Sequence, residues 1–319
     1  MRLAEAAERV GRIRAQDLAA HERRAKRLME EGIIAKVEWL SARVAAAQAA
    51  ADAESASADV RVAREGLLNL LSRNRTSVTP VTPLFIPNDL PERDTFLERI
   101  NDSHPVIALI EAKQRQARAG VEAERGQRRP TIYLFGMHEL VPEDLTLLDP
   151  RWAAGIGVRQ NLFDGGMSRH REAAARYLEE KASLTRKRLE RDLRTLAVKN
   201  WEEMHKALRE AEAMAELEEL ARENLRVRIR AFEEGVATSL EVIDASVALQ
   251  RARLGRIKAV HEAGQARSRL LAAAGLSDAC LAYLDRGRPL EIAWTELILE
   301  PMAPGDDSNQ PETEEVKSP

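Results

Sequence analysis

The chain has 319 residues, of which 32% are charged and only 4% aromatic, and its formal net charge is −3. The near-neutral charge argues against a nucleic-acid-binding protein, and the excess of Ala, Glu, Arg and Leu favours long helices over a thick globular core. Cys280 is the single cysteine, which excludes an internal disulfide. No apolar run approaches the roughly 20 residues that a membrane-spanning helix needs.

Residues 1–78 are predicted to form a first helical hairpin. Apolar residues recur every three or four positions before and after a break at Gly32, as the apolar stripes of two consecutive helices would. The stripe residues are Leu3, Ala6, Val10, Ile13, Val37, Leu40, Val44 and Ala47. Residues 79–103 are rich in Pro and Thr at their start and are predicted to be a linker. A helix is predicted over 104–129, because His104-Pro105 suits a helix start.

Residues 130–166 are predicted to form a β-hairpin. The runs 131–138 and 151–161 are rich in β-branched and aromatic residues, and the second run alternates with a period of two. Trp152, Ala154, Ile156 and Val158 fall on one face, and small or polar residues fall on the other. Such a pair of faces is typical of a sheet with lipid outside and water inside, so Trp152, Ile156 and Val158 are predicted to face the membrane.

Gly165 and Gly166 end the strand pair and let the backbone turn sharply into a helix. Residues 167–276 are predicted to form a second helical hairpin, with one helix to about residue 230, a break at Gly235 and a partner helix from about 240 to 271. A helix of that length must pack beside others in a bundle or coiled coil. Residues 277–319 are predicted to be a tail that is disordered from about 301.

An internal repeat relates the two hairpins. Residues 30–42 align with residues 233–245 at an offset of 203 without a gap, and the offset still holds at Leu67-Leu68 against Leu270-Leu271. The repeat predicts two long helical hairpins that arose by duplication.

The segment Gln160-Asn161-Leu162-Phe163-Asp164-Gly165-Gly166, after a strand entered through Arg129-Pro130, resembles the turn of the outer-membrane efflux protein family, the TolC type. Together with the duplicated helices, the resemblance covers about residues 1–276. It implies a mainly α fold whose antiparallel hairpins build a coiled-coil-like α-barrel. The β-hairpin would contribute to a trimeric outer-membrane β-barrel, and the helix over 104–129 would lead to the membrane.

The family signature G-x-x-(S/T)-x-x-(D/E)-x-x-x-A fits Gly235, Thr238, Glu241 and Ala245, whereas the first copy has Ala35 in the Ser/Thr place. The resemblance implies that the tunnel mouth is lined by carboxylates, six of them coming from the paired acids of three protomers, and such a ring favours cations. The implied constriction residues are Glu241, Asp244, Glu38 and Phe232. The alternative for the acids is a solvated helix face. Ala237 stands where some members carry an Arg, which implies a less tightly held closed state.

By resemblance, the chain is expected to be the outer-membrane duct of a tripartite efflux or type I secretion system, for passive export. The expected partners are two further copies in a homotrimer, a periplasmic adaptor, an inner-membrane pump and outer-membrane lipid, with no nucleic acid. No enzyme activity, cofactor or metal is expected, because the six histidines are scattered without ligand spacing. The alternative is a soluble coiled-coil scaffold or a periplasmic adaptor protein.

The first repeat begins at Met1 inside a helix, without a signal peptide or preceding strands. The family pattern has one strand hairpin in each repeat, and the six strands of three such chains fall short of the roughly eight of the smallest barrels. The chain is therefore expected to be N-terminally truncated, with a signal peptide, a helix and a second strand pair encoded upstream. Its expected location, the outer membrane with periplasmic helices, depends on that signal peptide.

Overall fold

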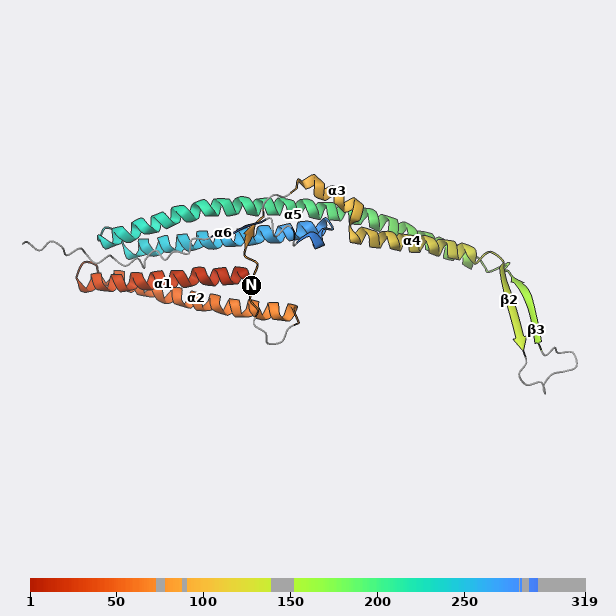
Figure 1. The fold of residues 1–319 in the computed structure, drawn as a ribbon, viewed down its shortest axis with the longest axis horizontal. Coiled ribbons are helices and arrows are strands. Elements are labelled where there is room, and N and C mark those ends of the chain that lie inside the picture. Colours follow the sequence, from red (N-terminus) through yellow and green to blue (C-terminus); the bar gives the residue numbers. More distant parts are fainter. Residues whose placement is uncertain (73–77, 88–90, 139–151, 281, 283–286, 292–319) are drawn as a thin grey trace, which may run out of the picture. The chain divides into compact units, whose positions relative to one another are not determined.

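The computed structural model describes residues 1–72, 78–87, 91–138, 152–280, 282 and 287–291 (Figure 1). The loop predicted after residue 138 and the tail predicted to be disordered lie outside these residues. The chain divides into two compact units. We call Met1–Leu90, Trp201–Arg267 and Leu281–Pro319 the bundle unit, and Pro91–Asn200 and Ser268–Cys280 the strand unit.

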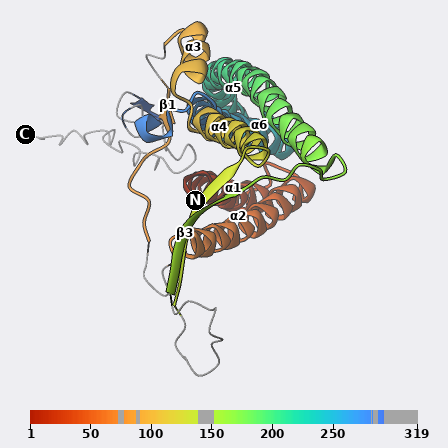
Figure 2. The same cartoon turned by 90° about the vertical axis from the view of Figure 1, so that its right-hand side faces the viewer.

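The bundle unit is built from helices of two hairpins. The first hairpin is α1 (Arg2–Glu30) and α2 (Lys36–Leu70), which lie side by side in Figure 2. The second combines the C-terminal half of α5 (Met167–Glu233) with most of α6 (Ser239–Ala273). The two predicted helical hairpins are therefore present, and the predicted breaks at Gly32 and Gly235 separate their helices.

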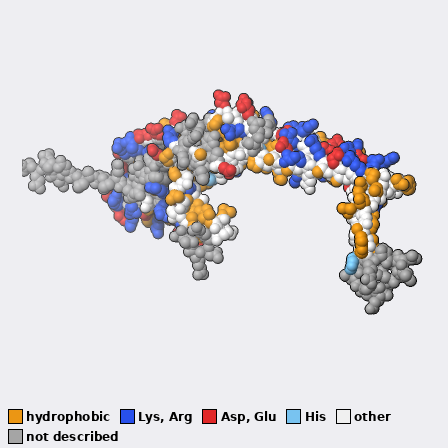
Figure 3. All heavy atoms as spheres, turned by 45° about the vertical axis from the view of Figure 1, so that its right-hand side comes forward, with side chains coloured by type: hydrophobic (Ala, Val, Ile, Leu, Met, Phe, Trp, Pro, Cys, Tyr) orange, Lys and Arg blue, Asp and Glu red, His pale blue; other side chains and the backbone are white. Residues whose placement is uncertain are grey.

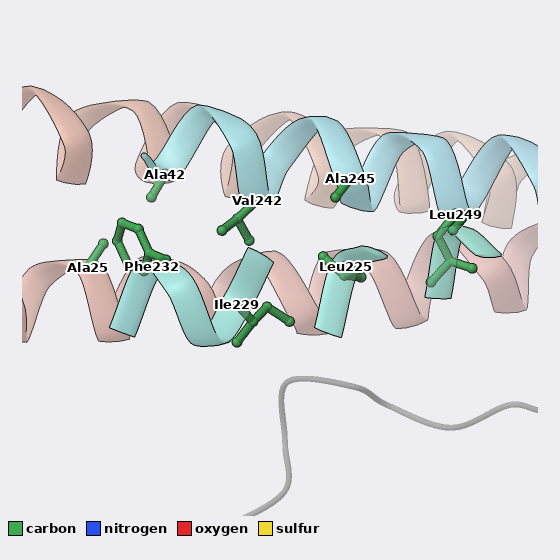
Figure 4. Close-up of a cluster of buried hydrophobic side chains, with 9 residues drawn as sticks. Ala25, Ala42, Leu225, Ile229, Phe232, Val242, Ala245 and Leu249 are labelled. Atoms are coloured by element: carbon green, nitrogen blue, oxygen red, sulfur yellow. The ribbon is translucent and has the colours of Figure 1, made fainter. Parts of the chain in front are cut away.

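One apolar cluster joins all four helices of this unit (Figure 4). Small alanines let the helices approach closely, and larger side chains from α5 and α6 fill the space between them, at the density usual for protein interiors. The cluster consists of Ala25, Ala42, Ala221, Leu225, Ile229, Phe232, Val242, Ala245 and Leu249. Both repeats thus share one core.

A two-stranded sheet also belongs to the bundle unit. β1 (Phe85–Ile86) pairs antiparallel with β4 (Arg288–Pro289). Leu84, Ile86 and Leu290 pack against a small cluster formed by Ala211, Ala259 and Val260. The predictions of a linker over 79–103 and of a tail over 277–319 did not include these two strands. The apolar residues in and beside the strands explain the difference, since they are partly buried against the helices.

The strand unit begins with two helices, α3 (Arg93–Ser103) and α4 (Pro105–Gly126). The helix α3 corrects the linker prediction a second time. Its Phe96 and Ile100, four residues apart, are fully buried, so packing stabilises this helix. The prolines before it favour a linker in the sequence prediction. The predicted start at His104-Pro105 is confirmed, since the His104 side chain accepts a hydrogen bond from the Val106 amide and caps α4. A short 3₁₀ helix, η2 (Ser277–Ala279), follows α6.

The predicted strand pair is the other main feature of this unit. β2 (Thr131–His138) and β3 (Trp152–Arg159) run antiparallel, in a register that pairs Thr131 with Arg159 and His138 with Trp152. Among the described residues the fold is therefore mainly α, with long antiparallel helical hairpins and one β-hairpin, as predicted.

None of the helices in the described residues is both long enough and apolar enough to cross a membrane.

Candidate functional site

The tips of the two helical hairpins have the same backbone geometry. Gly32 and Gly235 adopt positive φ angles of 76° and 70°. In the first turn the Ile33 amide donates to the Leu28 carbonyl at 2.8 Å, and in the second the Val236 amide donates to the Ala231 carbonyl at 2.8 Å. Both pairs are separated by the repeat offset, and the bond pattern is that of a glycine-capped helix end. The duplication is therefore present in the hydrogen bonds as well as in the sequence.

Glu38 of the first repeat bonds to the second repeat. Its carboxylate accepts a 2.7 Å hydrogen bond from the backbone amide of Ser239, the first residue of α6. A carboxylate at this position satisfies a free amide of the helix start and interacts favourably with the helix dipole. The Glu38 side chain is half-buried. Its bond to Ser239 joins the two hairpins, and part of the side chain remains exposed to solvent.

Glu241 and Asp244, the two acids of the second repeat, differ in whether they form an ion pair. The Glu241 carboxylate forms an ion pair with Arg228 of α5 at 2.8 Å, and both side chains are more than 40% exposed. Asp244 is exposed, and within the described residues it forms no hydrogen bond or ion pair. The two carboxylates lie three residues apart on one face of α6. Asp244 is therefore the acid whose charge is least compensated within one chain.

Phe232 does not line an opening of this chain. Its side chain is only 1% exposed and packs in the shared core, with its ring 4.7 Å from the imidazole of His21 (Figure 4). The interpretation of Phe232 as a constriction residue is corrected accordingly. The structure shows a packing role for Phe232 near the tip of the second hairpin.

Sequence reasoning missed His21, which is buried where the two hairpins meet. Its Nε2 lies 2.8 Å from the Ser239 hydroxyl, and the neighbouring Arg24 forms an ion pair with Glu233. Burial, helped by the nearby Arg24 charge, lowers the pKa of His21 from 6.5 to about 4. A signal existed in the sequence, because His21 follows Asp17 by four residues on the apolar stripe of α1, where polar residues are unusual.

The strand pair has one uncovered apolar face. Trp152, Ile156 and Val158 are 70%, 71% and 68% exposed, and the register adds Ile132 and Leu134 of β2 to the same face. Figure 3 shows hydrophobic side chains over the strands. The predicted alternation is confirmed, whereas the contact with lipid stays a prediction. The sequence interpretation did not assign Ile132 and Leu134 to this face, because only the register places them there.

The opposite face of the strand pair matches aromatic rings to glycines. Tyr133 pairs with Gly157 and Phe135 with Gly155, and a Cβ added at Gly157 would lie 2.5 Å from Cζ of Tyr133. The Arg159 guanidinium lies 5.3 Å from the Tyr133 ring centroid. Rings that cover glycines on the neighbouring strand stabilise a pair that has little else to bury.

Beyond the strands, Gly165 and Gly166 turn the chain into α5 with φ angles of 63° and 89°. Asp164 caps the helix, since its carboxylate accepts hydrogen bonds from the Gly166 amide at 3.0 Å and the Ser168 amide at 2.9 Å. The Ser168 hydroxyl also donates to it. These bonds, that of the Ser168 hydroxyl foremost, lower the pKa of Asp164. The predicted turn glycines are thus confirmed as positive-φ residues.

A glutamate fixes α4 to α5 near this turn. Glu172 is buried and accepts hydrogen bonds from Arg125 at 2.9 Å, Arg176 at 2.6 Å and Arg128 at 3.3 Å. The bond from Arg125, followed by that from Arg176, lowers the pKa of Glu172. The carboxylate stays ionised and holds the start of α5 against the end of α4. Within the described residues no group of three or more His, Cys, Asp or Glu side chains could hold a metal.

Comparison with known proteins places this geometry in a family. A profile of the outer membrane efflux protein family matches residues 97–276. Among solved structures, the outer membrane protein VceC from Vibrio cholerae is similar at 14% identity and a TM-score of 0.70 over 86% of this chain. CusC is similar at 15% identity and a TM-score of 0.75 over 86% of this chain. The MtrE outer membrane channel of Neisseria gonorrhoeae is similar at 18% identity and a TM-score of 0.69, also over 86%.

These likenesses show a common fold. The chain spans about two thirds of the length of those three structures, namely 66%, 65% and 65% of VceC, CusC and MtrE. No curated protein matches the sequence significantly. Since the family profile covers more than half of the chain, the protein belongs to the outer membrane efflux protein family.

Proposed function

We propose that the protein is part of a trimeric duct in the outer membrane, through which substrates delivered by an inner-membrane pump and a periplasmic adaptor pass without covalent change. The β2–β3 pair would lie in the outer membrane, and the helical hairpins would form a periplasmic tunnel. The observation that carries the proposal is the uncovered apolar face of Ile132, Leu134, Trp152, Ile156 and Val158 on a strand pair that continues into a helix of 67 residues.

Assembly of three copies is supported by apolar stripes that the chain leaves uncovered. On α2, Val37, Leu40 and Val44 recur at helical spacing and are 62%, 43% and 69% exposed. On α5 of the same unit, Leu217 and Leu220 are 47% and 62% exposed. Stripes of this kind on two helices of one unit are suited to packing against the next copy around a closed ring.

The gate of the duct would lie at the hairpin tips. In a trimer, Asp244 and Glu241 of three chains would form a ring of six carboxylates, which favours cations at the mouth. Glu38 would serve mainly to join the hairpins, because its carboxylate is bonded to Ser239. The alternative, that Glu241 and Asp244 are only a solvated helix face, predicts no effect on conduction.

The strand pair also argues against the alternative functions, a soluble coiled-coil scaffold or a periplasmic adaptor protein. A soluble scaffold has no need of five exposed apolar side chains on one strand face. A periplasmic adaptor should carry a β-sandwich, and the strands in the described residues form only two separate two-stranded sheets.

The assembly test is the mass of the detergent-solubilised protein, measured by light scattering after size exclusion. We expect trimers, and we expect Val37→Glu with Leu40→Glu to give smaller species. Ser55→Glu, an exposed change on the same helix, serves as the control. A native protein that is a stable monomer or dimer under these conditions would contradict the duct.

The membrane test uses an environment-sensitive label on a single introduced cysteine, with Cys280→Ser as background. A label at Ile156 should shift to the emission of an apolar solvent in lipid vesicles, and a label at Ala153 on the opposite face should shift less. Equal emission from both positions would count against a lipid-facing strand pair.

A further inference from the structure

We infer that a pocket where the strands meet α5 binds the phosphate of an anionic phospholipid headgroup. The pocket is lined by Arg128 at the end of α4, Arg169 in the first turn of α5, and the amide side chains of Gln127, Gln160 and Asn161. The inference rests on the proposed function, because it requires the strand pair to lie in a membrane. It adds a ligand and a site for that ligand.

The charge around the pocket is strongly positive. Within residues 127–131 and 159–171 there are five arginines and one carboxylate, that of Asp164. That carboxylate is already engaged by the amides of Gly166 and Ser168 and by the Ser168 hydroxyl. It therefore caps the helix, and none of these bonds goes to the arginines of the pocket. The positive charge of the site comes from guanidinium side chains. The backbone amides at the start of α5 already bond to Asp164, and the site does not need them to bind an anion.

The two arginines of the pocket are available to an anion in different degrees. Arg169 is exposed and has no ion-pair partner among the described residues. Arg128 contacts Glu172 at 3.3 Å, but that carboxylate also serves Arg125 and Arg176 at shorter distances. Glu172 thus serves three guanidinium groups, of which Arg125 also pairs with Glu122 at 2.7 Å. A phosphate diester would supply the missing negative charge and accept hydrogen bonds from guanidinium and amide groups together.

Apolar side chains beside the pocket favour a lipid over a free anion. Leu162 and Phe163 line the same pocket, and each is 88% exposed. The apolar strand face ends at the same place, since Ile132 pairs with Val158 one position before the Thr131–Arg159 pair. Figure 3 shows Lys and Arg side chains next to the hydrophobic strands. Exposed apolar groups beside guanidinium groups fit the boundary between acyl chains and headgroups.

The test is calorimetric titration of the detergent-solubilised full chain with dihexanoyl phosphatidylglycerol below its micelle concentration, in a buffer without phosphate. Saturable binding is expected, with dihexanoyl phosphatidylcholine binding more weakly. Arg128→Gln with Arg169→Gln should weaken binding roughly thirtyfold, as expected for two basic side chains at an anionic headgroup. The control, Arg191→Gln with Arg194→Gln, removes two exposed charges further along α5 and should change nothing.

A second variant gives an effect of opposite sign. Glu172→Gln removes the carboxylate that competes for Arg128 and should tighten phosphatidylglycerol binding. If Arg128 served only to hold α4 to α5, Glu172→Gln would weaken phosphatidylglycerol binding instead. Weaker binding by Glu172→Gln, or unchanged binding by the double arginine variant, would overturn the site.

The source of the phosphate is tested by competition with inorganic phosphate. Phosphate alone should displace the lipid poorly, because it leaves Leu162 and Phe163 uncovered, and equal potency would overturn the lipid as ligand. These outcomes are separate from those of the proposed function, since the trimer mass and the label emission are measured on proteins that keep Arg128, Arg169 and Glu172.

Discussion

His21 and Ser239 lie 218 positions apart in the sequence, and their side chains meet at 2.8 Å in the buried contact between the two repeats. The amide of Ser239 meanwhile donates to Glu38. One residue at the start of α6 is thus bonded to both helices of the first hairpin. Because α1 and α2 are held to α6 only a few residues before Glu241 and Asp244, the tips of the two hairpins can move apart only if these bonds break.

The bonded histidine makes the stability of this contact depend on pH. The pKa of His21 is about 4 in the folded protein and near 6.5 in an unfolded chain, so the unfolded chain binds the proton first as the pH falls. Neutral His21 contributes roughly 3 kcal/mol to the free energy of unfolding. This contribution is complete above pH 6.5 and is lost as the pH falls through 4. The charged groups at this contact are Arg24, which acts on the ring and pairs with Glu233, and Glu38, which bonds the amide of Ser239.

Thermal unfolding followed by circular dichroism between pH 4 and 8 measures this dependence. His21→Asn should lower the melting temperature at pH 7.5 and flatten its fall towards pH 4. His170→Asn changes an exposed histidine and should keep the native pH profile. An unchanged slope in His21→Asn would remove His21 as the cause.

The gate prediction is sharpened by the ion pair of Glu241 with Arg228. Glu241→Gln together with Asp244→Asn should reduce the cation preference of the assembled channel. Asp244→Asn alone should account for most of the loss, because Glu241 is already paired. Arg228→Gln should instead increase the preference, since it leaves Glu241 uncompensated. Reversal potentials in a salt gradient across a planar bilayer measure all three, and identical potentials would mean that these acids are a solvated helix face.

The hairpin tips and their turn glycines could be located from the sequence, for a local reason. The turn glycines, the helix period and the repeat are properties of neighbouring residues, so the sequence carries them directly. The partners of Glu38 and His21 lie about 200 residues away, and no short-range pattern encodes them. Phe232 was placed at the constriction by the family resemblance, whereas its burial depends on packing against residues of α1.

The same distinction explains the errors around the linker. β1 and β4 contain two residues each and lie about 200 positions apart, so neither shows a strand period. The helix α3 follows a Pro-rich stretch, and the burial of Phe96 and Ile100 that stabilises it comes from tertiary contact. The β2–β3 pair, by contrast, shows a clear period of two and was predicted with nearly the observed bounds.

The glycines of β3 offer a test of the strand pair. Gly157→Ala places a Cβ against Tyr133 and should destabilise the pair by about 1–3 kcal/mol, as overpacking does. Adding Tyr133→Ala should recover part of that loss, which a double-mutant cycle in detergent would measure. Gly136→Ala is the control, because its Cβ would meet only the Ala153 carbonyl at 4.0 Å. Additive effects of Gly157→Ala and Tyr133→Ala would exclude the contact.

A buried carboxylate between α5 and α6 should be indispensable to the bundle unit. Glu218 is 3% exposed and accepts hydrogen bonds from Arg222 at 2.9 Å and from Arg253 and Arg256 at 3.2 Å. Removing one partner of such a group leaves buried charge uncompensated, so Glu218→Gln should cost at least about 3 kcal/mol in unfolding free energy. Chemical denaturation measures it, with the exposed neighbour Glu219→Gln as control, and equal losses in both variants would contradict the assignment.

The repeat also predicts a stabilising substitution. Ser72 has a φ of 51°, the only positive value among the non-glycine residues that the structure describes, and the repeat offset aligns it with Gly275 at 74°. The capping bonds correspond as well, since the Ser72 amide donates to the Asn69 carbonyl and the Gly275 amide to the Ala272 carbonyl. The first repeat thus carries a side chain at a left-handed position where the second has glycine.

Ser72→Gly should therefore raise the unfolding free energy by about 1 kcal/mol, because glycine adopts this conformation without the clash of a Cβ. Ser72→Ala keeps the Cβ and should give no gain, which separates the backbone effect from loss of the hydroxyl. The reverse change, Gly275→Ser, should cost more than Ser72→Gly gains. Its Cβ would lie 3.2 Å from Cα of His104 and 3.3 Å from Cδ of Pro105, so it would strain the start of α4 in addition to the backbone. Equal and opposite effects at the two positions, measured by denaturation, would mean that backbone strain alone distinguishes them and that the close contact with His104 contributes nothing.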